Sequence, residues 1–270
     1  MIELSKTARD ELAGVDFVLT DIDDTLTAEG RVSCAAYCAL WSLHDAGIKV
    51  IPVTGRPAGW CDLIARQWPI SGVVGENGAF VFAVEDGHMR HYYHPSVERE
   101  TAMPRLRQIA ERVYREVPGT REAKDQFARM FDIAVDFREE PPFLEYSEAE
   151  KIKLIFEEEG ATAKVSSIHV NAWFGTYDKL AMTRLYFLEH LGIDVEDPGQ
   201  NRRVLFCGDS PNDEPMFGFF RNACAVANIE PFIPTIQNLP RFITAASHGD
   251  GFAEAAARVL DARSAEFPRA

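Results

Sequence analysis

The chain has 270 residues and a formal net charge of -14, with 46% hydrophobic and 26% charged residues. A chain of this size and composition can bury a hydrophobic core, and none of its apolar runs approaches the roughly 20 residues that a transmembrane helix needs. The excess of acidic residues argues against nucleic acid and anionic membranes as partners, because both bind clusters of Lys and Arg. We therefore expect a globular protein that binds neither.

The beginning of the chain and the cysteines indicate where the protein works. Residues 1–14 mix acidic and basic residues and lack the apolar stretch of a secretory signal. The five cysteines include no Cys-x-x-Cys pair, which argues against a disulfide framework or a zinc site. Cys34 and Cys38 are one helical turn apart, and we interpret them as small buried residues rather than as ligands. We expect a reducing, cytoplasmic location.

Acidic residues follow the first predicted strand directly. Residues 15–19 are β-branched and aromatic, as in a buried strand of a parallel sheet, and Asp21, Asp23 and Asp24 come next. Ligands of open α/β sheets bind at the carboxyl ends of strands. Two carboxylates so close together are tolerated where a cation neutralises them or where one carries a proton. The alternative is an acidic turn in which Asp24 and Thr25 cap the next segment.

Strands and helices then alternate. The pattern predicts a strand that leads into Thr54-Gly55-Arg56 and, after the next helix, a short strand that leads into Glu76-Asn77-Gly78-Ala79. Because parallel crossovers are right-handed, Thr54 is expected at the same sheet edge as Asp21. The predicted elements are a helix over 33–46, a strand over 49–53, a helix over 58–68, a strand over 72–74 and a hairpin over 80–84 and 89–93.

The pattern changes near residue 94 and resumes near residue 176. Between these points we predict a helix over 99–116, a strand over 130–137, a helix over 147–159 and a strand over 164–171. After them come a helix over 178–191, strands over 203–207, 223–227 and 242–245, and a helix over 251–260. The sequence thus predicts an α/β fold, with a Rossmann-like parallel-sheet core over 1–93 and 176–270 and an inserted α/β cap over 94–175.

Four motifs in this order resemble those of the haloacid dehalogenase superfamily of phosphohydrolases. They are Asp21-Ile22-Asp23-Asp24-Thr25, Thr54-Gly55-Arg56, Lys179 and Gly208-Asp209-Ser210-Pro211-Asn212-Asp213. The large cap, preceded by Glu76-Asn77-Gly78-Ala79, resembles subclass IIB, and within it the mannosylglycerate phosphate and sucrose phosphate phosphatases. The subclass usually has glycine after the motif lysine, whereas this chain has Leu180.

The resemblance implies a role for each motif residue. Asp21 would be the nucleophile that forms an aspartyl-phosphate, and Asp23 the general acid and base. Thr54 and Lys179 would bind the phosphoryl oxygens. Mg²⁺ would be held by the carboxylates of Asp21, Asp209 and Asp213 and by the backbone carbonyl of Asp23. Asp24 would be peripheral, and the expected substrate-binding residues are Gly55, Arg56 and Asn212.

Some of these roles have alternatives. Arg56 is equally consistent with an ion pair to a nearby acid, and Asn212 with bracing the metal loop. We expect Arg121, Arg129 and Arg138 to pair with acids of the protein. Four residues lie where the cap returns to the core. Of these, His169 and Asn171 are suited to bind a sugar, and Trp173 and Phe174 are expected to be packing residues.

The expected function is a Mg²⁺-dependent phosphatase that acts on a small phosphorylated metabolite, a sugar or sugar-acid phosphate. The alternatives are a phosphomutase of the same superfamily and a catalytically silent protein that binds a phosphometabolite. The sequence does not predict the oligomeric state.

Overall fold

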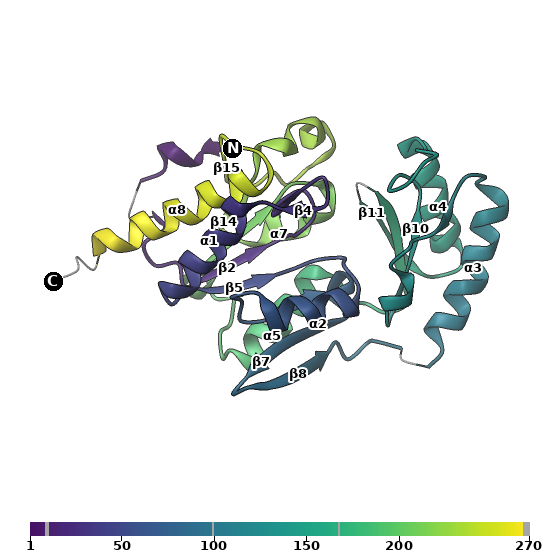
Figure 1. Ribbon diagram of the computed structural model, residues 1–270, viewed down its shortest axis with the longest axis horizontal. Coiled ribbons are helices and arrows are strands. Elements are labelled where there is room, and N and C mark those ends of the chain that lie inside the picture. Colours follow the sequence, from purple (N-terminus) through teal and green to yellow (C-terminus); the bar gives the residue numbers. More distant parts are fainter. Residues whose placement is uncertain (9–10, 99, 167, 267–270) are drawn as a thin grey trace.

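A parallel sheet forms the centre of the computed structural model, which describes residues 1–8, 11–98, 100–166 and 168–266 (Figure 1). Within these residues the sheet has six strands, all parallel. In spatial order they are β1 (Ile2–Glu3), β15 (Phe242–Ile243), β14 (Asn222–Ala225), β13 (Val204–Gly208), β2 (Phe17–Thr20) and β5 (Lys49–Pro52). The predicted parallel α/β core is therefore confirmed.

Helices cover both faces of this sheet because successive strand residues point to opposite sides. In β2, Val18 packs in one hydrophobic cluster, and Phe17 and Leu19 pack in another. The first cluster includes residues of α1 (Cys34–Asp45), α2 (Ala58–Gln67) and α8 (His248–Glu266). The second includes residues of α5 (Lys179–His190) and α7 (Glu214–Phe219). A short helix, α6 (Pro198–Asn201), precedes β13.

Helix ends in the core follow simple capping rules. The Ser33 hydroxyl accepts a hydrogen bond from the Ala36 backbone N–H at the start of α1. Asp178 caps α5 in the same way through Ala181 N–H, so Lys179 is the first residue of that helix. Leu180, at the position where the subclass usually has glycine, packs partly buried against the second core cluster.

Two small antiparallel units extend the core. One is the predicted hairpin, which forms a sheet of β6 (Val73–Gly75), β7 (Phe80–Glu85) and β8 (His88–Tyr93). A parallel bridge between Val53 and Val74 joins this sheet to the end of β5. The other unit, which the sequence pattern did not reveal, pairs β3 (Thr27–Ala28) with β4 (Arg31–Val32).

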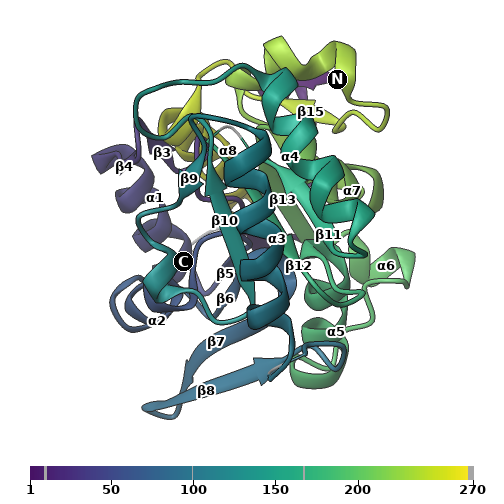
Figure 2. The same ribbon diagram turned by 90° about the vertical axis from the view of Figure 1, so that its right-hand side faces the viewer.

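A second sheet with two helices forms the segment from α3 to β12, which we call the cap. Its antiparallel strands are β11 (Thr162–Val165), β12 (His169–Trp173), β10 (Asp132–Asp136) and β9 (Arg121–Glu122). The helices α3 (Ala102–Glu116) and α4 (Tyr146–Glu158) cover the sheet face that is turned away from the core (Figures 1 and 2). A hydrophobic cluster of its own fills the space between this sheet and these helices.

The predicted single strand over 164–171 is wrong. The chain turns after β11 and comes back as β12, antiparallel to it. Ser166 stabilises the turn, because its backbone N–H donates to His169 O and its hydroxyl accepts from His169 N–H. A polar side chain that closes a turn in this way breaks a run that otherwise reads as one strand.

The two connections between core and cap touch each other. Thr176 N–H donates to the hydroxyl of Ser96 at 3.0 Å, across a sequence separation of 80 residues. Gly175, at φ +131°, lies so close that an added Cβ would be 2.9 Å from Ser96 O. The precise bounds of the core and cap domains stay predictions. None of the helices in the described ranges is both long and apolar enough to cross a membrane.

Candidate active site

The motif residues meet at the carboxyl ends of three neighbouring strands. Strand β2 ends at Thr20 and leads into Asp21, and its neighbours β13 and β5 lead into Asp209 and Thr54. Parallel pairing brings these three ends to one edge of the sheet. Lys179 reaches the same place from the first turn of α5.

Three buried carboxylates form a compact cluster there. Oxygen atoms of Asp21, Asp209 and Asp213 all lie within 4.8 Å of one another. The Lys179 ammonium donates to Asp21 Oδ1 and to Asp213 Oδ1, at 2.8 Å in both cases. Thr25 donates its hydroxyl to Asp209 Oδ1 at 3.0 Å. One ammonium thus faces three carboxylates, which leaves excess negative charge in a buried place.

Burial and the neighbouring acids raise the pKa values of two of these carboxylates, Asp21 and Asp209. Burial raises the pKa of Asp21 to about 7, with Asp213 and Asp23 adding to the rise and Lys179 opposing it. Burial and the neighbouring Asp213 and Asp21 also raise the pKa of Asp209 well above its usual value. A divalent cation would relieve this repulsion, and carboxylate oxygens are the ligands that Mg²⁺ prefers. The residues present therefore fit the predicted metal.

The backbone around the cluster is built to bring the carboxylates close. Asp213 Oδ2 accepts from Asp209 N–H at 3.1 Å. A Cβ added to Gly208 would lie 2.5 Å from the same oxygen, so a larger residue at 208 would push Asp213 away. Asn228, which sequence reasoning missed, donates to Asp209 Oδ2 at 3.4 Å and to the Asp24 carbonyl at 3.0 Å. The Asp24 backbone therefore supports the site.

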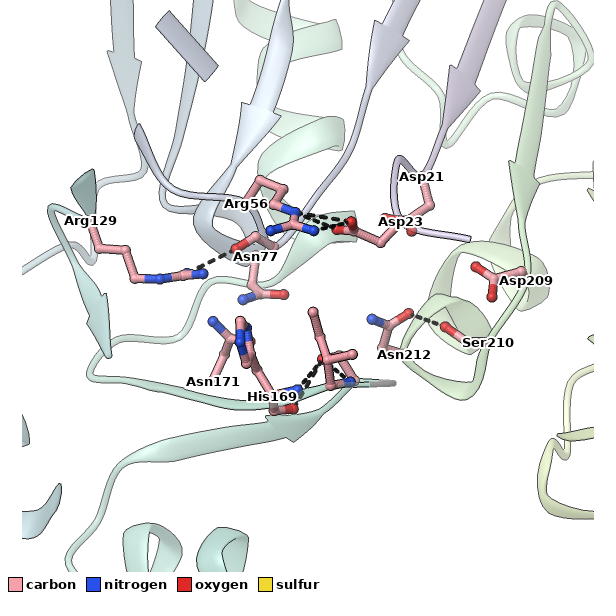
Figure 3. A pocket seen from close by; sticks show the side chains of 13 residues that line it. Asp21, Asp23, Arg56, Asn77, Arg129, His169, Asn171, Asp209, Ser210 and Asn212 are labelled. Carbon is pink, nitrogen blue, oxygen red and sulfur yellow. Dashed lines mark hydrogen bonds and ion pairs between the residues drawn. The ribbon is translucent and has the colours of Figure 1, made fainter. Parts of the chain in front are cut away.

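Asp23 turns its carboxylate across the cleft toward Arg56 (Figure 3). Arg56 Nε donates to both Asp23 oxygens at 2.9 and 3.0 Å, and Nη2 donates to Oδ1 at 2.6 Å. Arg56 also lies 3.7 Å from Asp125 of the cap and over the ring of Trp60. Of the two interpretations of Arg56, the structure shows the ion pair, and the side chain lines the cleft as well.

Thr54 is fully buried beside this pair. Its hydroxyl oxygen accepts from Arg56 N–H at 3.0 Å, so the hydroxyl proton stays available for another acceptor. Gly55 and Asn212 line the cleft, as do Asp21, Asp23 and Asp209. The structure thus brings the predicted site residues together, and their chemical roles stay predictions.

The cap forms the opposite wall of the cleft (Figure 3). Asn171 and His169 lie on this wall, as the sequence suggested, and the His169 ring is 2.9 Å from Glu139 Oε2. Trp173 and Phe174 are buried packing residues, as expected. Arg129 lines the wall but pairs with Asp125 and Asp132, and Arg121 pairs with Asp136. Three more residues that line the cleft escaped sequence reasoning: Ser166 and Ile168 from the cap and Asn77 from the core.

Cys34 and Cys38 lie outside the cleft, and the interpretation of them as buried is wrong. Both side chains are exposed on α1, with their sulfur atoms 3.9 Å apart. The residues at these positions face solvent because Ala36, Leu40 and Leu43 take the buried face of the helix.

The sequence of the core matches a known enzyme family. Residues 18–116 match the family model described as haloacid dehalogenase-like hydrolase. A curated phosphoglycolate phosphatase of Methanothermobacter thermautotrophicus is 28% identical over 263 residues, which cover 90% of this chain and 98% of the relative. The model covers the first two motifs, and the relative extends the likeness over almost the whole chain.

Solved structures share the fold, including the cap. A protein of Thermoplasma acidophilum has a TM-score of 0.71 and 18% identity, covering 92% of this chain and 99% of the other. A subclass IIB sugar phosphatase of the superfamily has a TM-score of 0.65 and 15% identity, covering 92% of this chain and 100% of the other. The finer resemblance to mannosylglycerate phosphate and sucrose phosphate phosphatases stays a prediction. The chain therefore resembles the haloacid dehalogenase-like hydrolases over residues 18–116 and a phosphatase over almost its whole length.

Proposed function

We propose that this phosphatase is Mg²⁺-dependent and hydrolyses a small phosphomonoester through an aspartyl-phosphate on Asp21. The observation that carries the proposal is the buried cluster at the end of β2, where Asp21 shares Lys179 with Asp213 and lies near Asp209. A carboxylate held at the mouth of a cleft beside an ammonium is suited to attack phosphorus, because the ammonium offsets the repulsion between two anions.

The proposed reaction has two displacements. An oxygen of Asp21 forms a bond to phosphorus while the bond from phosphorus to the leaving oxygen breaks, and Asp23 gives that oxygen a proton. Asp23 then takes a proton from water, and the water oxygen displaces Asp21 from phosphorus. Phosphate and the free Asp21 carboxylate result. Asp23 is well placed for both steps because Arg56 holds its carboxylate at the cleft.

The other motif residues support these steps. Lys179 and the Thr54 hydroxyl bind phosphoryl oxygens and stabilise the charge that develops on them. Asp21, Asp209 and Asp213 would hold the Mg²⁺, together with the backbone carbonyl of Asp23. When bound, Mg²⁺ supplies positive charge that lowers the repulsion between the nucleophile and the phosphate.

The leaving group is proposed to be a sugar or sugar acid. Polar side chains on the cap wall support this, since amides and imidazole bind hydroxyl groups. The curated relative is a phosphatase of phosphoglycolate, which carries a carboxylate instead. We also propose a cytoplasmic location, on the basis of the cysteine content.

The test is phosphate release from a panel of sugar, polyol and acid phosphates, with and without Mg²⁺. We expect release that chelation abolishes, and a loss of at least about 10³-fold in Asp21→Asn. Asp24→Asn is the matched control, because Asp24 is the neighbouring acid and its side chain neither lines the cleft nor belongs to the cluster of three carboxylates. Its rate should stay within about twofold of the native rate.

Three outcomes would contradict the proposal. They are no release from any member of the panel, release that survives chelation, and full activity of Asp21→Asn. Isomerisation of a sugar phosphate without net release would instead identify the rival phosphomutase.

A further inference from the structure

One buried carboxylate organises the cap wall of the cleft. Asp132 in β10 is fully buried, and its Oδ2 accepts from the side-chain amides of Asn171 at 2.9 Å and Asn77 at 3.4 Å. Its Oδ1 accepts from Arg129 Nη1 at 2.9 Å. Asn77 comes from the core and Asn171 from β12, so Asp132 links three separate segments.

The bonds to Asp132 fix which end of each amide is free. An amide NH₂ group donates and the amide oxygen accepts. Since a carboxylate can only accept hydrogen bonds, Asp132 binds the NH₂ groups of Asn77 and Asn171. It makes no hydrogen bond with their Oδ1 atoms. Both side chains line the cleft (Figure 3). The cleft therefore presents carbonyl oxygens from both the core and the cap, and these attract hydroxyl protons and repel a carboxylate.

The positive charges of this wall are neutralised within the protein. Arg129 is paired with both Asp132 and Asp125, its side chain is only 1% exposed, and its Nη1 also donates to Gly55 O. His169 faces Glu139, and Arg56 is held by Asp23. Each basic side chain that lines the cleft in the described residues thus has an acidic partner. A carboxylate on the leaving group would meet no unpaired cation here.

We propose that Asp132 is a specificity-determining residue, which makes the enzyme prefer an uncharged, hydroxyl-bearing leaving group over one with a carboxylate. Asp132 acts from behind the wall: it orients two amides and cancels the charge of Arg129. The inference rests on the proposed phosphatase reaction. Of the sugar and sugar-acid phosphates considered there, the inference favours the sugar phosphates. It also predicts that phosphoglycolate, which carries a carboxylate, is a poor substrate.

The experiment compares two substrates that differ at one end only. Glycerol 3-phosphate carries a CH₂OH group where 3-phosphoglycerate carries a carboxylate. We expect the native enzyme to have a kcat/KM at least about 10-fold higher for glycerol 3-phosphate, since a site that leaves a buried polar group unpaired discriminates by this much or more. In Asp132→Asn the ratio of the two kcat/KM values should fall at least about 10-fold. Arg129 then loses one acidic partner, and the side-chain amides of Asn77 and Asn171 can rotate to expose their NH₂ groups.

Asp136→Asn is the matched control. Asp136 lies in the same strand, is also buried and is also paired with an arginine, but that arginine, Arg121, does not line the cleft, whereas the side chains bonded to Asp132 do. Its substrate ratio should equal the native ratio. A ratio of kcat/KM values is used because a partly unfolded sample lowers both values equally.

Asn171→Ala tests the same wall without removing a buried charge. It deletes one carbonyl acceptor that favours hydroxyl groups and disfavours a carboxylate, so it should lower the ratio of kcat/KM for glycerol 3-phosphate to that for 3-phosphoglycerate. This variant keeps the inference testable if Asp132→Asn fails to fold.

The results separate the inference from the function on which it rests. A native preference for 3-phosphoglycerate, or an unchanged ratio in both Asp132→Asn and Asn171→Ala, would overturn the inference and leave the phosphatase reaction standing. Failure of the native enzyme to release phosphate from any phosphomonoester would overturn the proposed function itself.

Discussion

Asp209 is a single buried acid that is expected to lower stability as long as no cation is bound beside it. It is buried among acids, and the uncharged groups that bind it, Thr25 and Asn228, hold it in place without cancelling its charge. Burying a charge without a counter-ion is unfavourable, so the metal-free protein keeps an unfavourable interaction here.

Replacing this charge should stabilise the metal-free enzyme. At about pH 8 in the presence of a chelator, Asp209→Asn should raise the free energy of unfolding by about 1 kcal/mol or more, because it removes repulsion and keeps the acceptor for Thr25. Mg²⁺ at about 100 times its Kd should add about 2.7 kcal/mol to the native protein and much less to the variant. Thermal or urea unfolding with and without Mg²⁺ measures both effects.

Asp24→Asn serves again as the control and should keep the native response to Mg²⁺. If Asp209→Asn is less stable than the native protein without metal, or gains the full Mg²⁺ effect, then Asp209 does not hold the ion.

At the scale of elements, the short 3₁₀ turn Glu76–Gly78 connects parts that are distant in the chain. Glu76 binds the first turn of α2 through Ala58 N–H, and Asn77 reaches Asp132 of the cap. Gly78, at φ +108°, packs against the backbone before α5, where an added Cβ would lie 2.0 Å from Asp178 O. This turn therefore sets the position of the helix that carries Lys179.

Gly78→Ala should disturb both stability and catalysis. We expect it to cost more than about 3 kcal/mol, because the side chain meets backbone as well as an unfavourable φ. Gly87→Ala is the matched control: Gly87 also has positive φ, +76°, but an added Cβ there meets nothing within 4 Å. It should cost only about 1 kcal/mol. Urea unfolding of both variants measures the difference, and equal losses would show that the contact with Asp178 is unimportant.

Elements and the core of the site were predictable where local patterns determine them. Buried strands at the centre of the sheet are short apolar runs, and acids that follow such strands must meet at one edge, as Asp21 and Asp209 do. Turns made by side chains were harder, and the hairpin at Ser166 was taken for one strand. The contact between Asn77 of the core and Asp132 of the cap is not predictable from the sequence, because it depends on how the cap folds back on the core.

At the scale of the whole molecule, buried polar groups join the cap to the core. Glu76 Oε1 accepts from Met130 N–H at 2.8 Å, and Oε2 accepts from Phe131 N–H at 2.7 Å. Arg129 donates to Gly55 O, and Arg56 lies near Asp125. Polar contacts of this kind depend on protonation and geometry more than an apolar interface does.

Glu76 should make stability depend on pH. Burial, with the nearby Asp132, raises the pKa of Glu76 from 4.5 to about 8, although backbone N–H groups oppose the rise. Between these values the folded protein holds a proton that the unfolded chain has released, so the free energy of unfolding must fall as pH rises through this window.

The comparison of two variants isolates this contribution. Urea unfolding at about pH 5 and about pH 9 should show a smaller loss of stability in Glu76→Gln than in the native protein, because glutamine does not titrate. The exposed Glu150→Gln should lose as much as the native protein. A Glu76→Gln loss equal to the native loss would assign the pH dependence to other acids.

The hydrogen bond between Thr176 and Ser96 holds together the two ends of the segment that contains the cap. These two residues are separated by 80 positions in the sequence, and the chain between them leaves the core and returns to it at one point. A segment with adjoining ends can be exchanged for another of different length without altering the register of the parallel strands, since neither connection has to stretch. We propose that the cap can be replaced as a unit while the core stays unchanged, and that such an exchange changes which phosphate esters are accepted.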